Sequence, residues 1–271
     1  IIEVLFMFPC TPLVVALTEK IIPGEDQKVH HNELQYITEI SLKSPATMIP
    51  QAKNELKRMA DMAQENLDRS IKGFLNQSDE YLNKIYHREE DINNVSHAIT
   101  DYLVKSNQLS LPLADQKILG SMFYVVNDIE RIGDHAENFA DYTKTELKHN
   151  TGLTGDAKEE IKKMYEAVSK LLKLSLESFM AQDGVNTQED KLAEIAALEA
   201  SIDKMERRYQ KHHIKRLAKG DCEPRAGLLF SDMLSELERI ADHSVNIAYS
   251  MSDEDEDEML AAENEALATN N

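Results

Sequence analysis

The chain has 271 residues, enough for one large or two medium-sized domains. Its formal net charge of −19 argues against non-specific nucleic-acid binding, which requires an extensive basic face, so we expect no nucleic-acid partner. The sequence has no tryptophan and only 9 glycines and 7 prolines, and it is rich in leucine, alanine, glutamate and lysine, a composition that favours helix along most of its length.

Residues 1–23 predict the end of a transmembrane or membrane-proximal segment. Residues 4–17 are mostly apolar, but fourteen residues are too few to span a bilayer. They lack the basic leader and small-residue cleavage site of a signal peptide. A helix packed on the following domain is the alternative. Residues 24–45 read as a polar linker, in which residues 34–37 alternate as an extended segment does.

Six long helical stretches follow, three in each half of the chain. We expect them at about residues 46–76, 79–105, 112–148, 156–182, 187–219 and 224–252. Such long helices, joined by short turns, predict two tandem three-helix bundles within residues 46–252. The first repeat spans residues 46–150 and the second residues 154–252. Residues 253–271 carry eight acidic and no basic residues, and they predict a disordered tail.

A nine-residue polar motif occurs twice in the chain. Residues 130–138 read E-R-I-G-D-H-A-E-N and residues 238–246 read E-R-I-A-D-H-S-V-N, with six of nine positions identical. The match extends outward, with Asp128 in the place of Glu236. Core packing requires only apolar positions, so a repeat this polar indicates an internal duplication that keeps the same charged groups in both halves.

Each copy of the motif places two carboxylates on one helix face. Residues four apart are neighbours on a helix, so Glu130 lies beside Asp134, and Glu238 beside Asp242. Like charges at this spacing repel, and a bound cation would offset the repulsion. The pattern therefore predicts a metal site on each motif. A network of solvated salt bridges is the alternative.

Neighbouring helices supply candidates to complete the two sites. Glu199 and Asp203, in the fifth stretch, are again four residues apart. The register-matched pair in the second stretch is Glu89 and Asn93, for which Glu90 or Asp91 could substitute. The predicted metal ligands are therefore Glu130, Asp134, Glu238, Asp242, Glu199, Asp203, Glu89 and Asn93. Carboxylate oxygens suit iron, manganese, magnesium or calcium, and nearby histidines add zinc to these alternatives; iron is the first candidate.

His135 and His243 follow the motif aspartates and lie about 100° around the helix from them. They are either further metal ligands or polar contacts between helices. The chain has one Glu-x-x-His spacing, at residues 146–149, whereas a ferritin-like di-iron site requires two. No nucleophile–base pair stands out either. We therefore expect a protein that is not an enzyme.

The repeated motif and the six helices in two halves resemble the PhoU family over about residues 46–252. The resemblance implies a domain that binds iron or other metals in multinuclear clusters and that regulates phosphate uptake. The acidic pair on the third helix of each bundle corresponds to Glu130 and Asp134, and to Glu238 and Asp242. Asn93 departs from the family pattern, since an acid is expected there.

The end of the apolar segment, residues 13–24, resembles the bacterial sodium/phosphate cotransporter family, whose membrane domain precedes a PhoU-like domain. This resemblance implies a cytoplasmic regulatory domain of a sodium-coupled phosphate transporter, at the cytoplasmic face of the inner membrane. Its partners would be a transmembrane transporter domain, in the same chain or separate, and, indirectly, inorganic phosphate. The alternative is a stand-alone PhoU-like adaptor for a phosphate transporter or a phosphate-sensing kinase. Long amphipathic bundles often pair, so a homodimer is a further expected partner.

Overall fold

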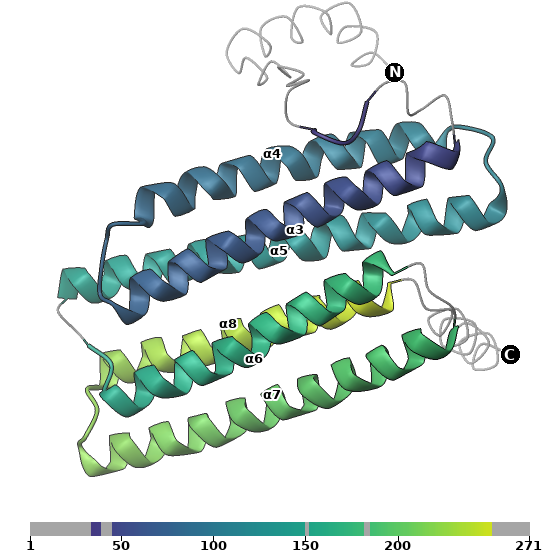
Figure 1. The fold of residues 1–271 in the computed structure, drawn as a ribbon. Coiled ribbons are helices and arrows are strands. Elements are labelled where there is room, and N and C mark those ends of the chain that lie inside the picture. Colours follow the sequence, from purple (N-terminus) through teal and green to yellow (C-terminus); the bar gives the residue numbers. More distant parts are fainter. Residues whose placement is uncertain (1–33, 39–44, 150–151, 182–184, 251–271) are drawn as a thin grey trace, which may run out of the picture. The chain divides into compact units, whose positions relative to one another are not determined.

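The computed structural model describes residues 34–38, 45–149, 152–181 and 185–250. These ranges contain six α-helices and no β-strand, which confirms the predicted all-α class (Figure 1). The helices are α3 (Pro45–Leu75), α4 (Leu82–Asn107), α5 (Leu113–His149), α6 (Gly155–Met180), α7 (Val185–Lys219) and α8 (Pro224–Tyr249). The predicted membrane-proximal segment, most of the linker and the acidic tail lie outside the described residues. None of the helices described is both long and apolar enough to cross a bilayer.

Local signals set where several helices begin and end. Thr154 caps α6, because its hydroxyl accepts a hydrogen bond from the backbone N–H of Ala157 at 3.3 Å. Pro224 lies in the first turn of α8, where its missing N–H is not required. Gly220 follows α7 with a φ of +76°, which residues with a side chain rarely adopt. The predicted helix ends agree with the observed ends to within three residues.

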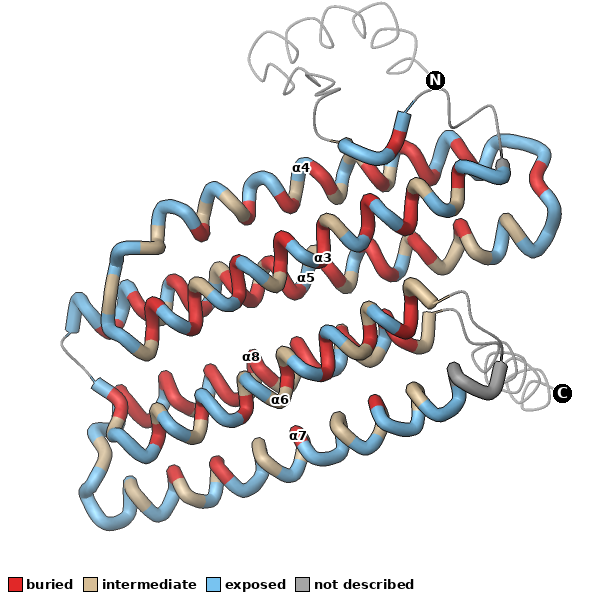
Figure 2. Tube along the Cα trace, viewed as in Figure 1, coloured by how far each residue is buried: buried red, intermediate tan, exposed pale blue. Residues whose placement is uncertain are grey.

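The six helices form two bundles of three. Helices α3, α4 and α5 pack together in the first repeat, and α6, α7 and α8 in the second. The repeats meet where α5 packs on α8 and α3 on α6, so α4 and α7 lie on the outside (Figure 1). In Figure 2 the buried positions of α5 and α8 recur along each helix, whereas α7 is exposed over much of its length. These buried positions follow the apolar steps of three and four in the sequence.

Polar side chains also join α3 to α6 across the boundary between the repeats. The side-chain amide of Gln64 donates to the Ser169 hydroxyl at 2.7 Å. Close to this contact, the Tyr165 hydroxyl donates to the Asp68 carboxylate. The two repeats are therefore connected by specific hydrogen bonds as well as by apolar packing.

The prediction of an extended segment at residues 34–37 is wrong. An extended strand requires a partner strand, which the described residues do not provide, and the chain bends back onto α3 instead. The backbone N–H groups of Gln35 and Tyr36 donate to Glu55 Oε2 at 2.8 and 2.7 Å. Glu55 is fully buried and also pairs with Arg58, while Ile37 joins the core. This part of the predicted linker is thus docked on the bundle.

Candidate functional site

The first repeat brings the predicted acidic residues of α4 and α5 together. Glu89 on α4 lies close enough to Glu130 and Asp134 on α5 for their charges to raise its pKa. Glu137, one turn beyond Asp134, adds to the same field. Glu90 and Asp91 are exposed, so Glu89 is the acid that α4 directs at the motif. The structure thereby selects one of the three acids that the sequence left open.

Glu89 is an unusual carboxylate because it is only 3% exposed and neither of its oxygens accepts a hydrogen bond of good geometry, although the nearby Asn93 side chain acts to lower its pKa. It fits against α5 because residue 133 is glycine. A Cβ added to Gly133 would lie 2.7 Å from Glu89 Oε2 and 3.3 Å from Ile92 Cγ2. Buried polar groups without partners are rare in proteins and call for an explanation. An oxygen-binding group at this position would provide one.

Burial and neighbouring negative charges hold the protons of this cluster more tightly than in water. Burial contributes most to raising the pKa of Glu89 to about 8, and the charges of Asp134, Glu137 and Glu130 follow in that order. The pKa of Glu130 is raised by burial and by Asp134, and that of Glu137 by burial, Asp141 and Asp134. The cluster therefore has a deficit of positive charge, which a cation would relieve.

The second repeat gathers the corresponding acids of α7 and α8. The pKa of Glu199 on α7 is raised by burial and by Asp203 and Asp242. That of Glu238 on α8 is raised by burial, Asp242, Glu206 and Asp203. One acid of this group has a partner, since Asp203 Oδ2 pairs with Arg207 Nη2 at 2.7 Å. All four predicted ligands of this repeat thus lie in one cluster.

The two clusters differ in burial and in membership. Asn93 is half-buried beside Glu89, and its Oδ1 has no hydrogen-bond partner, so it adds a neutral oxygen where the second repeat has Asp203. Within the described residues, no three His, Cys, Asp or Glu side chains are already arranged to hold a metal ion. The acids share a face and an electrostatic field, and an ion would have to draw their oxygens inward. The residue types fit a hard cation, and the metal assignment stays a prediction.

The motif histidines belong to the boundary between the repeats, not to the acidic clusters. His135 on α5 donates from Nδ1 to Glu236 on α8. In the reciprocal contact, His243 on α8 donates from Nδ1 to Asp128 Oδ1 on α5 at 2.8 Å. The centroids of the two imidazole rings are 5.6 Å apart. The second of the two predicted roles, a polar contact between helices, is therefore the one observed.

The motif asparagines complete the same interface. Asn138 Nδ2 donates to Glu236 Oε2 at 3.2 Å, and Asn246 Nδ2 donates to Asp128 Oδ1 at 3.4 Å. The hydroxyl of Tyr142 adds a bond to Glu236 Oε1 at 3.3 Å. In each repeat the His and Asn of one motif thus bind the acid that precedes the other motif. This reciprocity explains why both copies keep these three polar positions.

The two reciprocal contacts are not equally buried. The side chains of His135 and Glu236 are 9% and 10% exposed, whereas those of His243 and Asp128 are 25% and 14% exposed. Burial alone would raise the pKa of Glu236, but the hydrogen bond and charge of His135, with Asn138 and Arg239, bring it below its ordinary value. The His135–Glu236 contact is therefore the more buried of the two, and its carboxylate is stabilised in the ionised form.

Sequence reasoning missed four acids of these sites. Asp128 and Glu236 were visible as an outward extension of the repeat, and that match was the signal for a shared role. Glu137 is replaced by Val245 in the second motif, and Glu206 lies one turn beyond Asp203. Neither follows from the repeat. Only the packing of α4 on α5 and of α7 on α8 shows that they join the clusters.

Comparison with known protein families gives one match in each repeat. The model of the PhoU domain matches residues 56–143 and residues 161–251. Among curated proteins, the chain is similar to the phosphate-specific transport system accessory protein PhoU homolog 1 of Thermotoga maritima. The two are 20% identical over 196 residues, which cover 72% of this chain and 82% of that protein. The PhoU homolog of Clostridium acetobutylicum, with the same description, is 23% identical over 199 residues, or 73% and 87% of the two chains.

Solved structures give the same fold. The crystal structure of PhoU from Pseudomonas aeruginosa superposes with a TM-score of 0.67 at 20% identity, covering 76% of this chain and 95% of that chain. The phosphate transport system regulatory protein PhoU from Streptococcus pneumoniae superposes with a TM-score of 0.68 at 20% identity, covering 78% and 96%. These likenesses extend over both three-helix repeats.

Proposed function

Because the chain belongs to the PhoU family, we propose that it is an accessory protein that regulates a phosphate transport system. The observation that carries the proposal is the family match in both repeats, and the names of the two similar proteins support it. Such a role requires binding surfaces rather than a catalytic centre. We place its action at the cytoplasmic face of the inner membrane, beside a transporter or a phosphate-sensing kinase.

A second candidate is a PhoU-like regulatory domain attached to a sodium-coupled phosphate transporter. The apolar residues 4–17 favour it, since they precede the family match that begins at residue 56. The similar proteins, which are matched over 82% and 87% of their own length, favour the separate adaptor. The coding sequence upstream of Ile1 distinguishes the two. Several hydrophobic spans in the same reading frame would support the attached domain.

Phosphate uptake by cells tests the regulatory role directly. In cells that lack the gene, we expect uptake of radiolabelled phosphate to stay high after phosphate is supplied, whereas in cells with the gene it falls. Restoring the gene should restore the fall. Unchanged uptake in the deletion strain, under both scarce and abundant phosphate, would contradict the proposal.

We further propose that the two acidic clusters bind metal ions, with iron as the first candidate and manganese, magnesium or zinc as alternatives. In the first repeat the ligands would be Glu89, Glu130 and Asp134, with Asn93 as a neutral donor. In the second they would be Glu199, Asp203, Glu238 and Asp242. A bound cation would neutralise acids that otherwise repel one another across two helices. The buried oxygens of Glu89, which accept no hydrogen bond of good geometry, are the main structural support.

Elemental analysis of the purified, untagged chain tests the metal proposal. We expect near-integer metal in the native chain and none in the variant Glu130→Ala/Asp134→Ala/Glu238→Ala/Asp242→Ala, since it removes two carboxylates from each cluster. A matched control removes four exposed acids elsewhere, in the variant Asp61→Ala/Asp101→Ala/Glu166→Ala/Glu194→Ala. Equal metal in all three proteins, or no metal in the native chain, would rule out these sites.

A further inference from the structure

The end of α7 is strongly basic in a chain whose net charge is −19. Residues 207–219 contain six basic residues and no acidic residue. Arg207 pairs with Asp203, and Arg216 pairs with Glu160 at 2.8 Å. Positive charge concentrated on one helix end of an acidic protein predicts a negatively charged partner at that end.

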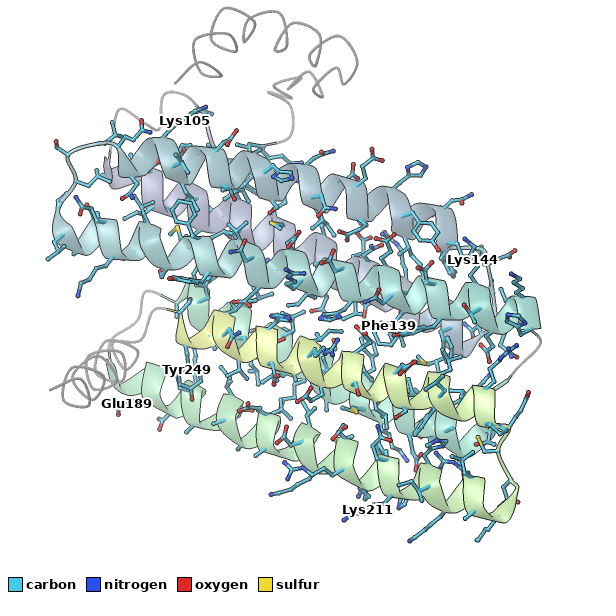
Figure 3. The ribbon with its side chains drawn as sticks, turned by 180° about the vertical axis from the view of Figure 1, so that it is seen from behind. Lys105, Phe139, Lys144, Glu189, Lys211 and Tyr249 are labelled. Atoms are coloured by element: carbon cyan, nitrogen blue, oxygen red, sulfur yellow. The ribbon has the colours of Figure 1, made fainter. Side chains whose placement is uncertain are left out.

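Three lysines form an exposed stripe along this helix end. Lys211, Lys215 and Lys219 are four residues apart, so they project from one face. All three are exposed, and within the described residues none of them forms an ion pair. Figure 3 shows Lys211 on the outer side of α7, away from α8. The stripe therefore has no partner within the bundle.

Large apolar side chains are exposed beside the lysines. Ile214 on α7 is 62% exposed, and Leu228 in the first turns of α8 is 65% exposed. Leu217 lies between the two helices, since its Cδ2 would be 3.3 Å from a Cβ on Gly227. We define the basic tip as Lys211, Lys215, Lys219, Ile214, Leu217 and Leu228. Basic and exposed aliphatic side chains together are typical of surfaces that bind anionic membranes.

We propose that the basic tip docks on the anionic surface of a lipid bilayer. The lysines would meet the headgroups, and Ile214 and Leu228 would enter the headgroup–acyl boundary. The rest of the protein is acidic and would be repelled by the same surface. That repulsion is screened beyond about 8–10 Å at physiological ionic strength, so the chain would approach with this tip first.

Acids at this end oppose the binding. Asp221 and Glu223 are exposed in the turn, and Asp156, Glu159 and Glu160 of α6 line one cavity with Lys215 and Arg216, although Glu159 pairs with Lys163 and Glu160 with Arg216. The attraction therefore depends on the face that the lysine stripe presents, and not on the net charge of this end.

The first repeat provides an internal comparison. The turn between α4 and α5 also exposes apolar side chains, with Val104 at 46% and Leu113 at 70%. The last turns of α4, however, carry Lys105 and Asp101 rather than a stripe of lysines. The apolar exposure is thus common to both turns, and the positive charge is specific to the α7–α8 turn. A membrane contact that depends on charge should involve the second repeat alone.

Vesicle binding by the full chain tests the proposal. We expect the native protein to co-sediment with vesicles of phosphatidylcholine and phosphatidylglycerol at 3:1, and far less with phosphatidylcholine alone. Reversal of the stripe, in Lys211→Glu/Lys215→Glu/Lys219→Glu, should weaken the anionic binding on the order of a hundredfold. A matched control with the same change in net charge, Lys84→Glu/Lys105→Glu/Lys148→Glu, should retain most of it. Leu228→Gln should weaken binding, whereas Leu113→Gln should not.

Three outcomes would overturn the membrane assignment. Equal binding to neutral and anionic vesicles, or equal loss in both lysine variants, would show that the basic tip is not the contact. Absence of vesicle binding by the native chain would also overturn the assignment, and a second measurement would then identify the partner: binding of a peptide of residues 252–262 by the native chain, and loss of that binding on reversal of the stripe. The partner would then be an acidic polypeptide. Phosphate uptake is measured separately, so failure of this proposal is distinguishable from failure of the proposed function.

Discussion

Replacement of Glu89 by glutamine is expected to stabilise the metal-free protein at alkaline pH. In chelator-treated protein at pH 8.5, Glu89→Gln should raise the free energy of unfolding by about 2–4 kcal/mol. The reason is that burial and three neighbouring acids raise the pKa of Glu89 to about 8, so ionisation of this residue opposes folding. Urea denaturation at a series of pH values measures the effect.

The sign of the pH dependence follows from proton binding. Between the unfolded pKa of about 4.3 and the folded pKa of about 8, the folded protein keeps a proton that the unfolded chain has lost. The stability of the native protein should therefore fall as pH rises through this window. In Glu89→Gln this contribution should be absent, and the two proteins should converge near pH 4.5.

The neighbouring residue provides a matched control for the Glu89 prediction. Glu90 has the same side chain, but it is 74% exposed, so Glu90→Gln should change stability little at any pH.

A bound cation should make the native protein more stable than Glu89→Gln, because the cation stabilises the carboxylate more than the amide. Equal stabilisation of native protein and Glu89→Gln by added metal would show that Glu89 is not a ligand.

Loss of His135 is expected to give the largest destabilisation among the motif residues. His135→Ala should lower the free energy of unfolding at pH 7 by about 2–4 kcal/mol, because it leaves the buried Glu236 without its principal partner. His243→Ala should cost less, since that contact is more exposed. Urea denaturation gives both values, with Arg131→Ala at an exposed motif position as a control.

A double-mutant cycle isolates the contact between the repeats. If His135 acts through Glu236, the loss in His135→Ala/Glu236→Gln should be smaller than the sum of the single losses by about 1 kcal/mol or more. The pKa of Glu236 is lowered in the native fold, so its contribution is present above the unfolded pKa of about 4.3. That contribution is lost as pH falls through the lower folded value. If the two single losses of stability add up exactly in the double variant, His135 does not act through Glu236.

The arrangement links the two proposed roles of the motif physically. The charges of Glu130 and Asp134 act on Glu89 of α4 within their own repeat, whereas His135 and Asn138 contact the opposite repeat. A charge change in an acidic cluster therefore occurs on the same two helical turns that hold the repeats together. Because these residues are close together, metal binding at an acidic cluster could shift the side chains that hold the two bundles together.

Much of the architecture follows from local patterns that the sequence shows directly. Periodic apolar residues and short turns predicted the six helices and placed their ends to within three residues, because these signals act within a few residues. The internal repeat gave the division into two bundles and singled out Glu130 and Asp134 with their counterparts. Residues four apart share a face in any helix, so this part of the site needed no tertiary information.

The rest depended on how the helices rotate and pack against one another. The sequence left Glu89, Glu90 and Asp91 as alternatives, and only the packing of α4 on α5 buries Glu89 beside Gly133. The same holds for His135, which is adjacent to Asp134 in sequence but contacts Glu236 on a helix 101 residues away. Adjacent residues on a helix diverge by about 100°, so their partners lie on different helices. The sequence alone determined which groups line each helix face, and the tertiary structure decided what each face meets and how deeply it is buried.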